Sequence, residues 1–239
     1  MYKLGASCDD EGTIVDCGCG TGTSTRRLAK QYPQAKQLIG IDLSPYFIDV
    51  GQTLLRLSPT AIDTNSNSKE GWITNIIPDE RIQLQQGDIS STELTSNSVS
   101  VVNLSLVLHE LPLYAAKEVI LEAHRILKQG GQLWISEMDF ESQAYKAQRE
   151  NAALFSLLRA TEPYLDEYAD GTTELRSFIL RQFDVVKITA ATGRHYALLG
   201  EKNDNKLSIE KAIEDSRFNE DGSYAIEDTH LRPWELSKQ

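Results

Sequence analysis

The chain has 239 residues, 40% of them hydrophobic, which suits one α/β domain with decorations and makes a second large domain unexpected. Its formal net charge of −11 repels phosphate backbones and so disfavours a nucleic-acid substrate. No apolar run approaches the roughly 18 residues of a membrane-spanning helix, and no secretory signal is visible. These features indicate a cytoplasmic protein, or a plastid protein if a leading segment is missing.

The three cysteines, Cys8, Cys17 and Cys19, are too few for a disulfide framework and fit a reducing compartment. Cys17 and Cys19 have no second Cys/His cluster to complete a metal site. We interpret both as small buried spacers and predict no metal.

The first predicted elements are a strand, a glycine-rich turn and a helix. The β-forming residues 13–15 indicate the strand, and an amphipathic run over 23–32, ended by Pro33, indicates the helix. Between them stand an acid, Asp16, and three glycines at alternate positions: Gly18, Gly20 and Gly22. Glycine accepts positive φ and lets a ligand approach the backbone. The helix N-terminus offers N–H groups to a negatively charged group.

The spacing of these glycines selects among ligands. The dinucleotide fingerprint would need a third glycine where Thr23 stands, and no Gly-Lys-Ser/Thr follows for a P-loop. The acid-x-Gly-x-Gly-x-Gly pattern instead resembles motif I of the class I S-adenosylmethionine (SAM) dependent methyltransferases. The resemblance implies that Asp16 and the three glycines bind SAM. A purely structural strand-to-helix turn is the alternative interpretation.

The second predicted strand, 37–42, ends in Asp42, whose carboxylate can accept hydrogen bonds from both ribose hydroxyls of an adenosine. Leu43 can pack on the adenine, and Ser44 and Pro45 open a helix over about 45–57. The alternative for Asp42 is a helix cap or a solvated loop acid. The polar stretch 58–80 is predicted to be a mobile loop.

The third predicted strand, 81–86, leads to Gly87, Asp88 and Ile89. In a doubly wound sheet this strand end adjoins the adenine pocket. Asp88 would accept from the adenine amino group, and Ile89 would close over the ring. A surface turn is the alternative.

The fourth predicted strand, 98–105, is almost continuously apolar, as expected of a central strand buried on both faces. Backbone carbonyls near Leu104 and Ser105 can accept from the ligand's amino group. The loop beyond faces the methyl group, so His109 is the first candidate for a general base and Glu110 the second. The alternative is that His109 only caps the next helix or holds a loop carbonyl.

The second half of the chain completes an α/β pattern. A helix over about 113–128, stopped by Gly130 and Gly131, precedes a strand over 132–137. Residues 139–182 are predicted to be a helical substrate cover. The strands 183–190 and 195–201 should form an antiparallel hairpin at the sheet edge. The domain is therefore assigned to 1–202, and the acidic extension 203–239 is expected to dock on it.

Four segments carry a wider resemblance to the class I SAM methyltransferases of the ubiquinone/menaquinone-biosynthesis type (the type 11/25 group): Asp16–Gly22, Gly40–Pro45, Gly87–Ile89 and Ala123–Gly131. Three later segments look like a branch seen in cyanobacteria, algae and plants: Leu108–Pro112, Thr161–Tyr164 and Gly193–His195. Two features depart from the pattern. Val99-Ser100 stands where many relatives have Phe-Asp, and only about a dozen residues precede the first strand, where a helical cap is usual.

The resemblance implies a Rossmann-like α/β fold. Its sheet would be seven-stranded and mostly parallel, in the order 3-2-1-4-5-7-6, with the last strand antiparallel and helices on both faces. It also implies SAM as cofactor and methyl transfer to a small-molecule acceptor. The alternatives are a partner subunit that binds SAM without catalysis, an NAD-dependent oxidoreductase and a polyamine synthase. The acceptor, the methylated atom and the oligomeric state stay open.

Overall fold

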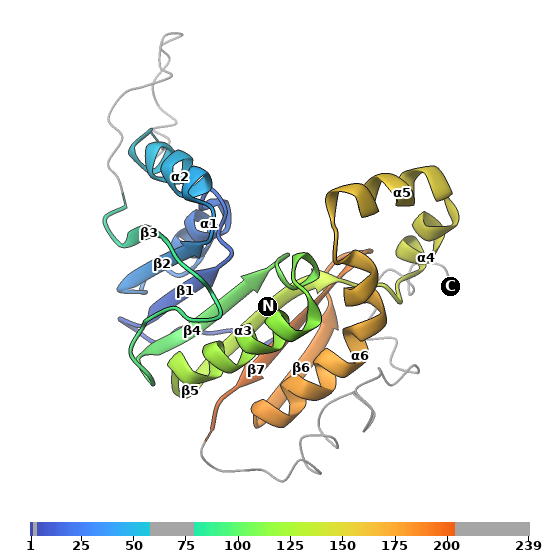
Figure 1. Ribbon diagram of the computed structural model, residues 1–239. Coiled ribbons are helices and arrows are strands. Elements are labelled where there is room, and N and C mark those ends of the chain that lie inside the picture. Colours follow the sequence, from blue (N-terminus) through green and yellow to red (C-terminus); the bar gives the residue numbers. More distant parts are fainter. Residues whose placement is uncertain (2–3, 58–78, 204–239) are drawn as a thin grey trace, which may run out of the picture.

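The computed structural model describes residues 1, 4–57 and 79–203 (Figure 1). The strands are β1 (Thr13–Cys17), β2 (Gln37–Asp42), β3 (Ile82–Gln86), β4 (Val99–Ser105), β5 (Leu127–Met138), β6 (Val185–Ala190) and β7 (His195–Glu201). The helices are α1 (Thr23–Gln31), α2 (Pro45–Leu57), the short 3₁₀ helix η2 (Leu108–Glu110), α3 (Leu113–Ile126), α4 (Gln143–Glu150), α5 (Ala152–Thr161) and α6 (Leu165–Gln182). The predicted loop 58–80, apart from its last two residues, and the acidic extension after 203 lie outside the described residues.

The strands form one seven-stranded sheet in the order β3-β2-β1-β4-β5-β7-β6. Neighbours from β3 through β5 are parallel, and β7 is antiparallel to both β5 and β6. The predicted fold class, strand order and antiparallel last strand are confirmed. Because the strand order reverses between the neighbours β1 and β4, their carboxyl ends flank the crevice in which doubly wound folds bind ligands.

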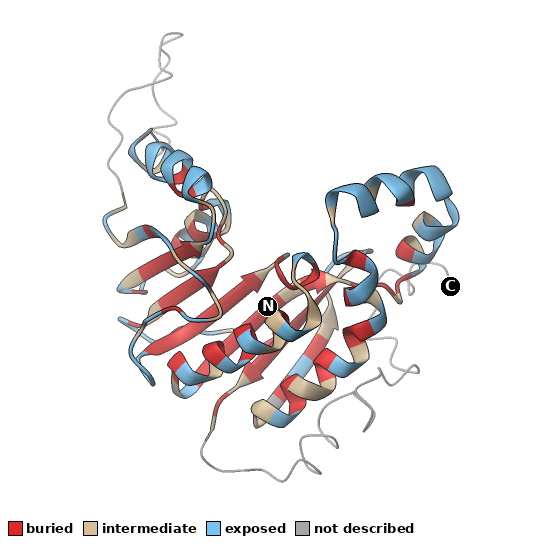
Figure 2. Ribbon diagram, in the orientation of Figure 1, coloured by how far each residue is buried: buried red, intermediate tan, exposed pale blue. Residues whose placement is uncertain are grey.

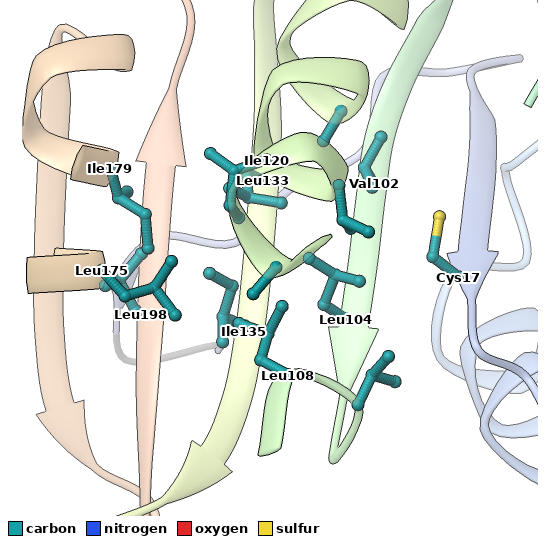
Figure 3. Packing of buried hydrophobic residues seen from close by; sticks show 14 of the residues in the cluster. Cys17, Val102, Leu104, Leu108, Ile120, Leu133, Ile135, Leu175, Ile179 and Leu198 are labelled. Carbon is teal, nitrogen blue, oxygen red and sulfur yellow. The ribbon is translucent and has the colours of Figure 1, made fainter. Parts of the chain in front are cut away.

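Helices cover both faces of this sheet. On one face, α1 packs through Ala29 against Ile14 and Leu38, and Trp134 of β5 belongs to the same cluster. On the other, α3 and α6 pack through residues such as Ile120 and Ile179 against the central strands (Figure 3). Figure 2 shows the result: buried strands between helices whose outer sides are exposed. β4 is buried on both faces over 99–104, as its apolar run predicts.

The end of α3 differs from the prediction. The helix stops at Ile126, and Leu127 is extended (φ −62°, ψ 134°) and begins β5. Leu127 is fully buried and pairs with Val99 of β4, so sheet pairing and burial outweigh the glycine stop signal. Gly130 does have the positive φ of 73° that the signal suggested, but within the strand.

The stretch predicted as a substrate cover contains α4, α5 and α6. Helix α6 belongs to the main helical layer, because Leu175 and Ile179 pack in the core with α3. Only α4 and α5 project beyond the sheet, and their surfaces are mostly exposed (Figures 1 and 2). A covering role for α4 and α5 stays a prediction. Among the described residues, no helix has the length and apolarity needed to cross a membrane.

Candidate cofactor and acceptor site

The glycine turn after β1 has the backbone that its sequence predicts. Gly18, Gly20 and Gly22 have φ of 68°, 53° and 77°, a region that favours glycine. A Cβ on Gly18 would stand 2.6 Å from a methyl group of Val107, whereas a Cβ on Gly20 would meet nothing within 4 Å. Gly18 therefore lets the loop after β4 approach, and the open side of Gly20 leaves room for a ligand.

The N–H groups of four residues of this turn are used within the protein, whereas the expected role of the N–H groups at the start of α1 stays a prediction. Gly18 N–H and Cys19 N–H both donate to the carbonyl of Ile41, at 2.8 and 3.1 Å. Gly20 N–H donates to Asp42 Oδ2 at 2.8 Å. Gly22 N–H donates to the Cys19 carbonyl. The turn is thus fastened to the end of β2.

Asp16 lies beneath the turn and is 1% exposed. Its carboxylate accepts from Ser24 Oγ at 2.7 Å, Thr25 Oγ1 at 2.6 Å and Asn103 Nδ2 at 2.7 Å. Burial raises the pKa of this carboxyl, and the three hydrogen bonds offset the rise only in part. These hydrogen bonds join β1, α1 and β4, so Asp16 shapes the site from below. A direct contact with a cofactor stays a prediction.

Asp42 ends β2 beside the turn. Its Oδ2 accepts from Gly20 N–H, and its Oδ1 accepts from Ser44 N–H at 2.9 Å. A carboxylate has about four lone-pair sites, so two remain for ligand hydroxyls. The next side chain, Leu43, is 71% exposed and is available to pack on a planar ligand.

The segment after β3 reaches the same end of the sheet, because Gly87 N–H donates to the Asp42 carbonyl at 3.0 Å. Asp88 is exposed, and its Oδ1 accepts from the backbone N–H and hydroxyl of Ser90. Ile89 is half-buried and packs against the α3 core. The turn-forming role considered for Asp88 is therefore present, and the carboxylate can still accept a ligand's hydrogen bond.

The end of β4 borders a cavity of about 730 Å³. Of the residues predicted to bind the cofactor, Gly18, Gly20 and Ser105 line it, together with Leu106, Arg27 of α1 and Trp134 of β5. Leu104 is fully buried, so only its backbone could serve a ligand. Leu106 has a positive φ of 59° and donates its N–H to the Ser136 carbonyl, which turns the chain away from the strand.

His109 lies in η2, just past β4, and is 3% exposed. Its Nδ1 is 2.7 Å from Glu137 Oε1, whereas its Nε2 is 3.8 Å from Glu162 Oε2, beyond hydrogen-bond distance. Burial alone would lower the pKa of His109, but the hydrogen bond and charge of Glu137, with Glu162 and Glu110, raise it above its ordinary value. The ring is thus held by a carboxylate, not by a loop carbonyl.

Glu137 is the functional residue that sequence reasoning missed. It is fully buried near the end of β5, and its Oε2 accepts from the N–H groups of Val107 and Leu108 at 3.1 and 2.9 Å. Its Oε1 accepts from Met138 N–H as well as from His109. A carboxylate near the end of a strand, just after the apolar Leu133–Ile135 segment, was the available signal. Glu137 fixes both the loop after β4 and the orientation of His109.

The structure also gathers two acids around His109, the exposed Glu110 and the half-buried Glu162. Glu110 follows it in η2, and Glu162 follows α5, about fifty residues later in the chain. One ligand atom from each of the three residues lies within 4.8 Å of the other two. Tyr168, in contrast, is buried and shares a hydroxyl hydrogen bond of 2.9 Å with Tyr196, which fits a structural role.

A family model described as a methyltransferase domain matches residues 15–135, which spans the glycine turn, Asp42 and His109. The chain belongs to this methyltransferase family. The curated relatives of this methyltransferase domain include a demethylmenaquinone methyltransferase from Lactobacillus johnsonii, 32% identical over 123 residues, covering 52% of this chain and 42% of the relative. Another is an uncharacterized methyltransferase from Emericella nidulans, 30% identical over 136 residues, with 54% and 42% covered. The chain spans less than half the length of these relatives.

Solved structures share the methyltransferase fold. An O-methyltransferase family protein from Burkholderia thailandensis has a TM-score of 0.58 at 20% identity and covers 81% of this chain and 52% of its own. A SAM-dependent methyltransferase from Methanosarcina mazei has a TM-score of 0.57 at 16% identity, with 85% and 98% covered. The family match and the curated relatives, together with the shared fold, make the chain a member of the class I SAM-dependent methyltransferase group, with SAM as the cofactor.

Proposed function

We propose that this domain transfers the methyl group of SAM to a small-molecule acceptor. The observation that carries the proposal is the Asp42 carboxylate. Two backbone N–H groups hold it at the end of β2, and it lies next to the open side of Gly20. This arrangement suits a nucleoside with a free 2′-hydroxyl, because the remaining lone pairs of the carboxylate can accept both ribose hydroxyls.

The residues around the turn fit the rest of the cofactor. Asp88 and Ile89 would lie beside the adenine, with Leu43 on its face. The carbonyls of Leu104 and Ser105 would accept from the amino group at the amino-acid end. Gly20 would leave room for that end, and Gly18 lines the same cavity. When bound, SAM supplies a methyl group on a positively charged sulfur. Asp16 would act indirectly, by holding the turn.

On the acceptor side we propose His109 as the group that takes a proton, with Glu110 as the second candidate. Glu137 accepts the Nδ1 proton of His109, so the lone pair of the neutral imidazole is on Nε2, which lies on the side of Glu162. Glu137 would also stabilise the imidazolium after proton transfer, as the carboxylate of a catalytic triad does. Glu137 is therefore a positioning residue, and Nε2 is the atom that receives the proton.

A small-molecule acceptor is favoured over a macromolecule by two observations. The net charge of −11 opposes nucleic-acid binding, and the Lactobacillus relative is named for the methylation of demethylmenaquinone. The cytoplasmic or plastid location stays a prediction.

Calorimetry of the full chain with S-adenosylhomocysteine and with NAD tests the cofactor assignment. We expect S-adenosylhomocysteine to bind and NAD to give no heat. Asp42→Asn should weaken binding by about tenfold or more, the loss of a charge-assisted pair of hydrogen bonds. Asp49→Asn, an exposed acid of α2, is the matched control. Tighter binding of NAD would favour the oxidoreductase alternative, and binding without transfer to any acceptor would favour the partner-subunit alternative.

A further inference from the structure

Three hydrogen-bond acceptors converge at the acceptor side of the site: Nε2 of His109, one carboxylate oxygen of Glu110 and one of Glu162. They come from the loop after β4 and from the end of α5, so they meet only in the folded chain. The His109 side chain is 4% exposed and that of Glu162 is 24% exposed, which places the cluster at the border between core and solvent.

His109 contributes an acceptor, not a donor, to this cluster. Because Nδ1–H points to Glu137, the neutral ring has no proton on Nε2. Nε2 is 3.8 Å from Glu162, too far for a hydrogen bond and with room for an atom that bridges the two. The Nε2 atom of this nearly buried ring, 3.8 Å from one carboxylate and clustered with a second, can therefore accept from a ligand with several donors.

The charge of the cluster is negative. The titratable groups around His109 are Glu110 of η2, Glu137 of β5, Glu162 at the end of α5, Tyr168 of α6 and His195 of β7. Burial raises the pKa of Glu110, and the charges of Glu162, Glu137 and Asp42 raise it further, while His109 lowers it in part. A cation bound among these carboxylates would relieve their repulsion.

We propose that Glu110, Glu162 and His109 bind a protonated amine and that its nitrogen is the atom that is methylated. The inference rests on the proposed function and names the acceptor's chemical class. An alkylammonium group has three N–H donors, which matches the three acceptors in number.

The spacing of the acceptors admits an ammonium as well as a metal ion. A nitrogen that donates three hydrogen bonds of about 2.8 Å in tetrahedral directions separates its acceptors by about 4.6 Å. A tetrahedral metal ion at about 2.1 Å from each ligand would separate them by about 3.4 Å. The 3.8 Å between His109 Nε2 and Glu162 Oε2 lies between these two separations, and no pair in the cluster is further apart than 4.8 Å. The number of donors therefore carries the amine assignment, and titration with metal ions tests it.

The same contacts describe the reaction. An ammonium has no lone pair, so one of its protons must first pass to Nε2 of His109, which leaves a neutral amine and an imidazolium paired with Glu137. Proton transfer leaves the amine lone pair directed at Nε2, so the amine first turns about its C–N bond. The lone pair then forms the new N–C bond with the methyl carbon as the C–S bond breaks and its electrons stay on sulfur. The products are a methylammonium, held by Glu110 and Glu162, and S-adenosylhomocysteine. The imidazolium returns its proton to solvent.

The test uses the full chain saturated with S-adenosylhomocysteine and three probes of one shape: 2-phenylethylamine, 2-phenylethanol and 3-phenylpropionate. Ring-nitrogen NMR of the histidines follows each titration. We expect the amine to shift the His109 Nε2 signal and to bind about tenfold more tightly than the alcohol and the acid. Glu162→Gln should weaken amine binding by about tenfold, and Glu110→Gln should have the same effect. Glu150→Gln, an exposed acid of α4, should change nothing.

Two further measurements separate the outcomes. Calorimetry with Zn²⁺ and Mn²⁺ is run on the same proteins, and micromolar binding lost in Glu162→Gln would identify a metal site and overturn the amine assignment. Equal binding of the three probes, or an unchanged amine affinity in Glu162→Gln, would also overturn it. If S-adenosylhomocysteine still binds in those cases, only the acceptor inference fails; if it does not bind at all, the proposed function fails.

Discussion

Replacing Glu137 by glutamine changes one oxygen of a buried carboxylate into an NH₂ group, and the surrounding donors determine the result. Oε1 accepts from His109 Nδ1 and Met138 N–H, and Oε2 accepts from Val107 N–H and Leu108 N–H. The N–H of His109 also donates to Oε2, at 3.4 Å, so an NH₂ group at the Oε2 position opposes three backbone donors. At the Oε1 position it opposes only Met138 N–H, provided that His109 moves its proton from Nδ1 to Nε2.

The glutamine orientation with its NH₂ group at the Oε1 position costs less free energy, so it determines the size of the destabilisation. One buried N–H without an acceptor costs about 1–3 kcal/mol, so Glu137→Gln should lower the free energy of unfolding by about 2 kcal/mol. For a domain of this size that corresponds to a fall in Tm of about 4–8 °C. The moved proton also occupies Nε2, which removes the proposed base and should slow methyl transfer by roughly 10²–10⁴-fold.

Three assays check this variant. Thermal unfolding gives the change in Tm, ring-nitrogen NMR gives the tautomer of His109, and calorimetry with S-adenosylhomocysteine should show nearly unchanged affinity. Glu118→Gln, an exposed acid of α3, is the control. A Tm within about 1 °C of the parent, or a proton that stays on Nδ1, would refute the reasoning.

The remaining predictions concern pH and the glycine turn. The proposed base must be neutral to accept a proton, and the pKa of His109 is raised, so kcat/KM should increase with pH at values above 6.5. A pH profile that rises below 6.5, or a rise that is unchanged in His109→Gln, would contradict this role of His109. Arg125, with Thr92, holds the pKa of Glu122 at about 2, so its stabilising effect is present at neutral pH and is lost as pH falls toward about 2. In this acidic range the free energy of unfolding should depend less on pH in Glu122→Gln than in the parent protein. Gly18 and Gly20 both have positive φ, so alanine at either position should lower the Tm. The clash with Val107 should make that loss larger for Gly18→Ala, whereas Gly20→Ala should weaken S-adenosylhomocysteine binding more, as melting curves and calorimetry would show. Equal effects of the two variants on both quantities would argue against the roles assigned to the glycines.

The fold was accessible from the sequence because its signals are local. Alternate glycines, apolar strands and their spacing predicted the strands and the turn at Gly18–Gly22, and the family resemblance implied the order of the strands in the sheet. The predicted end of α3 was wrong because a tertiary contact, the pairing of Leu127 with Val99, outweighed the signal at Gly130 for ending the helix. Local sequence patterns do not show that the residue after a helix will pair with a strand that is distant in the sequence.

The site was accessible only in part for the same reason. Asp42 and His109 follow strands and could be placed by the ends of those strands. Glu137 was read only as part of a strand, and its hydrogen bonds to the loop after β4 depend on which strand is its neighbour. Glu162 follows a helix outside the sheet, so nothing in its neighbourhood along the chain indicates that it lies 3.8 Å from His109.

The central claim is methyl transfer, and the most direct measurement is the transfer of a labelled methyl group from SAM. The full chain is incubated with methyl-labelled SAM and a fractionated cell extract, and mass spectrometry locates the label. We predict label in a small-molecule fraction, with formation of S-adenosylhomocysteine, and its loss in Asp42→Asn at limiting SAM. Label confined to macromolecules, or no label in any fraction from a protein that binds S-adenosylhomocysteine, would contradict the account.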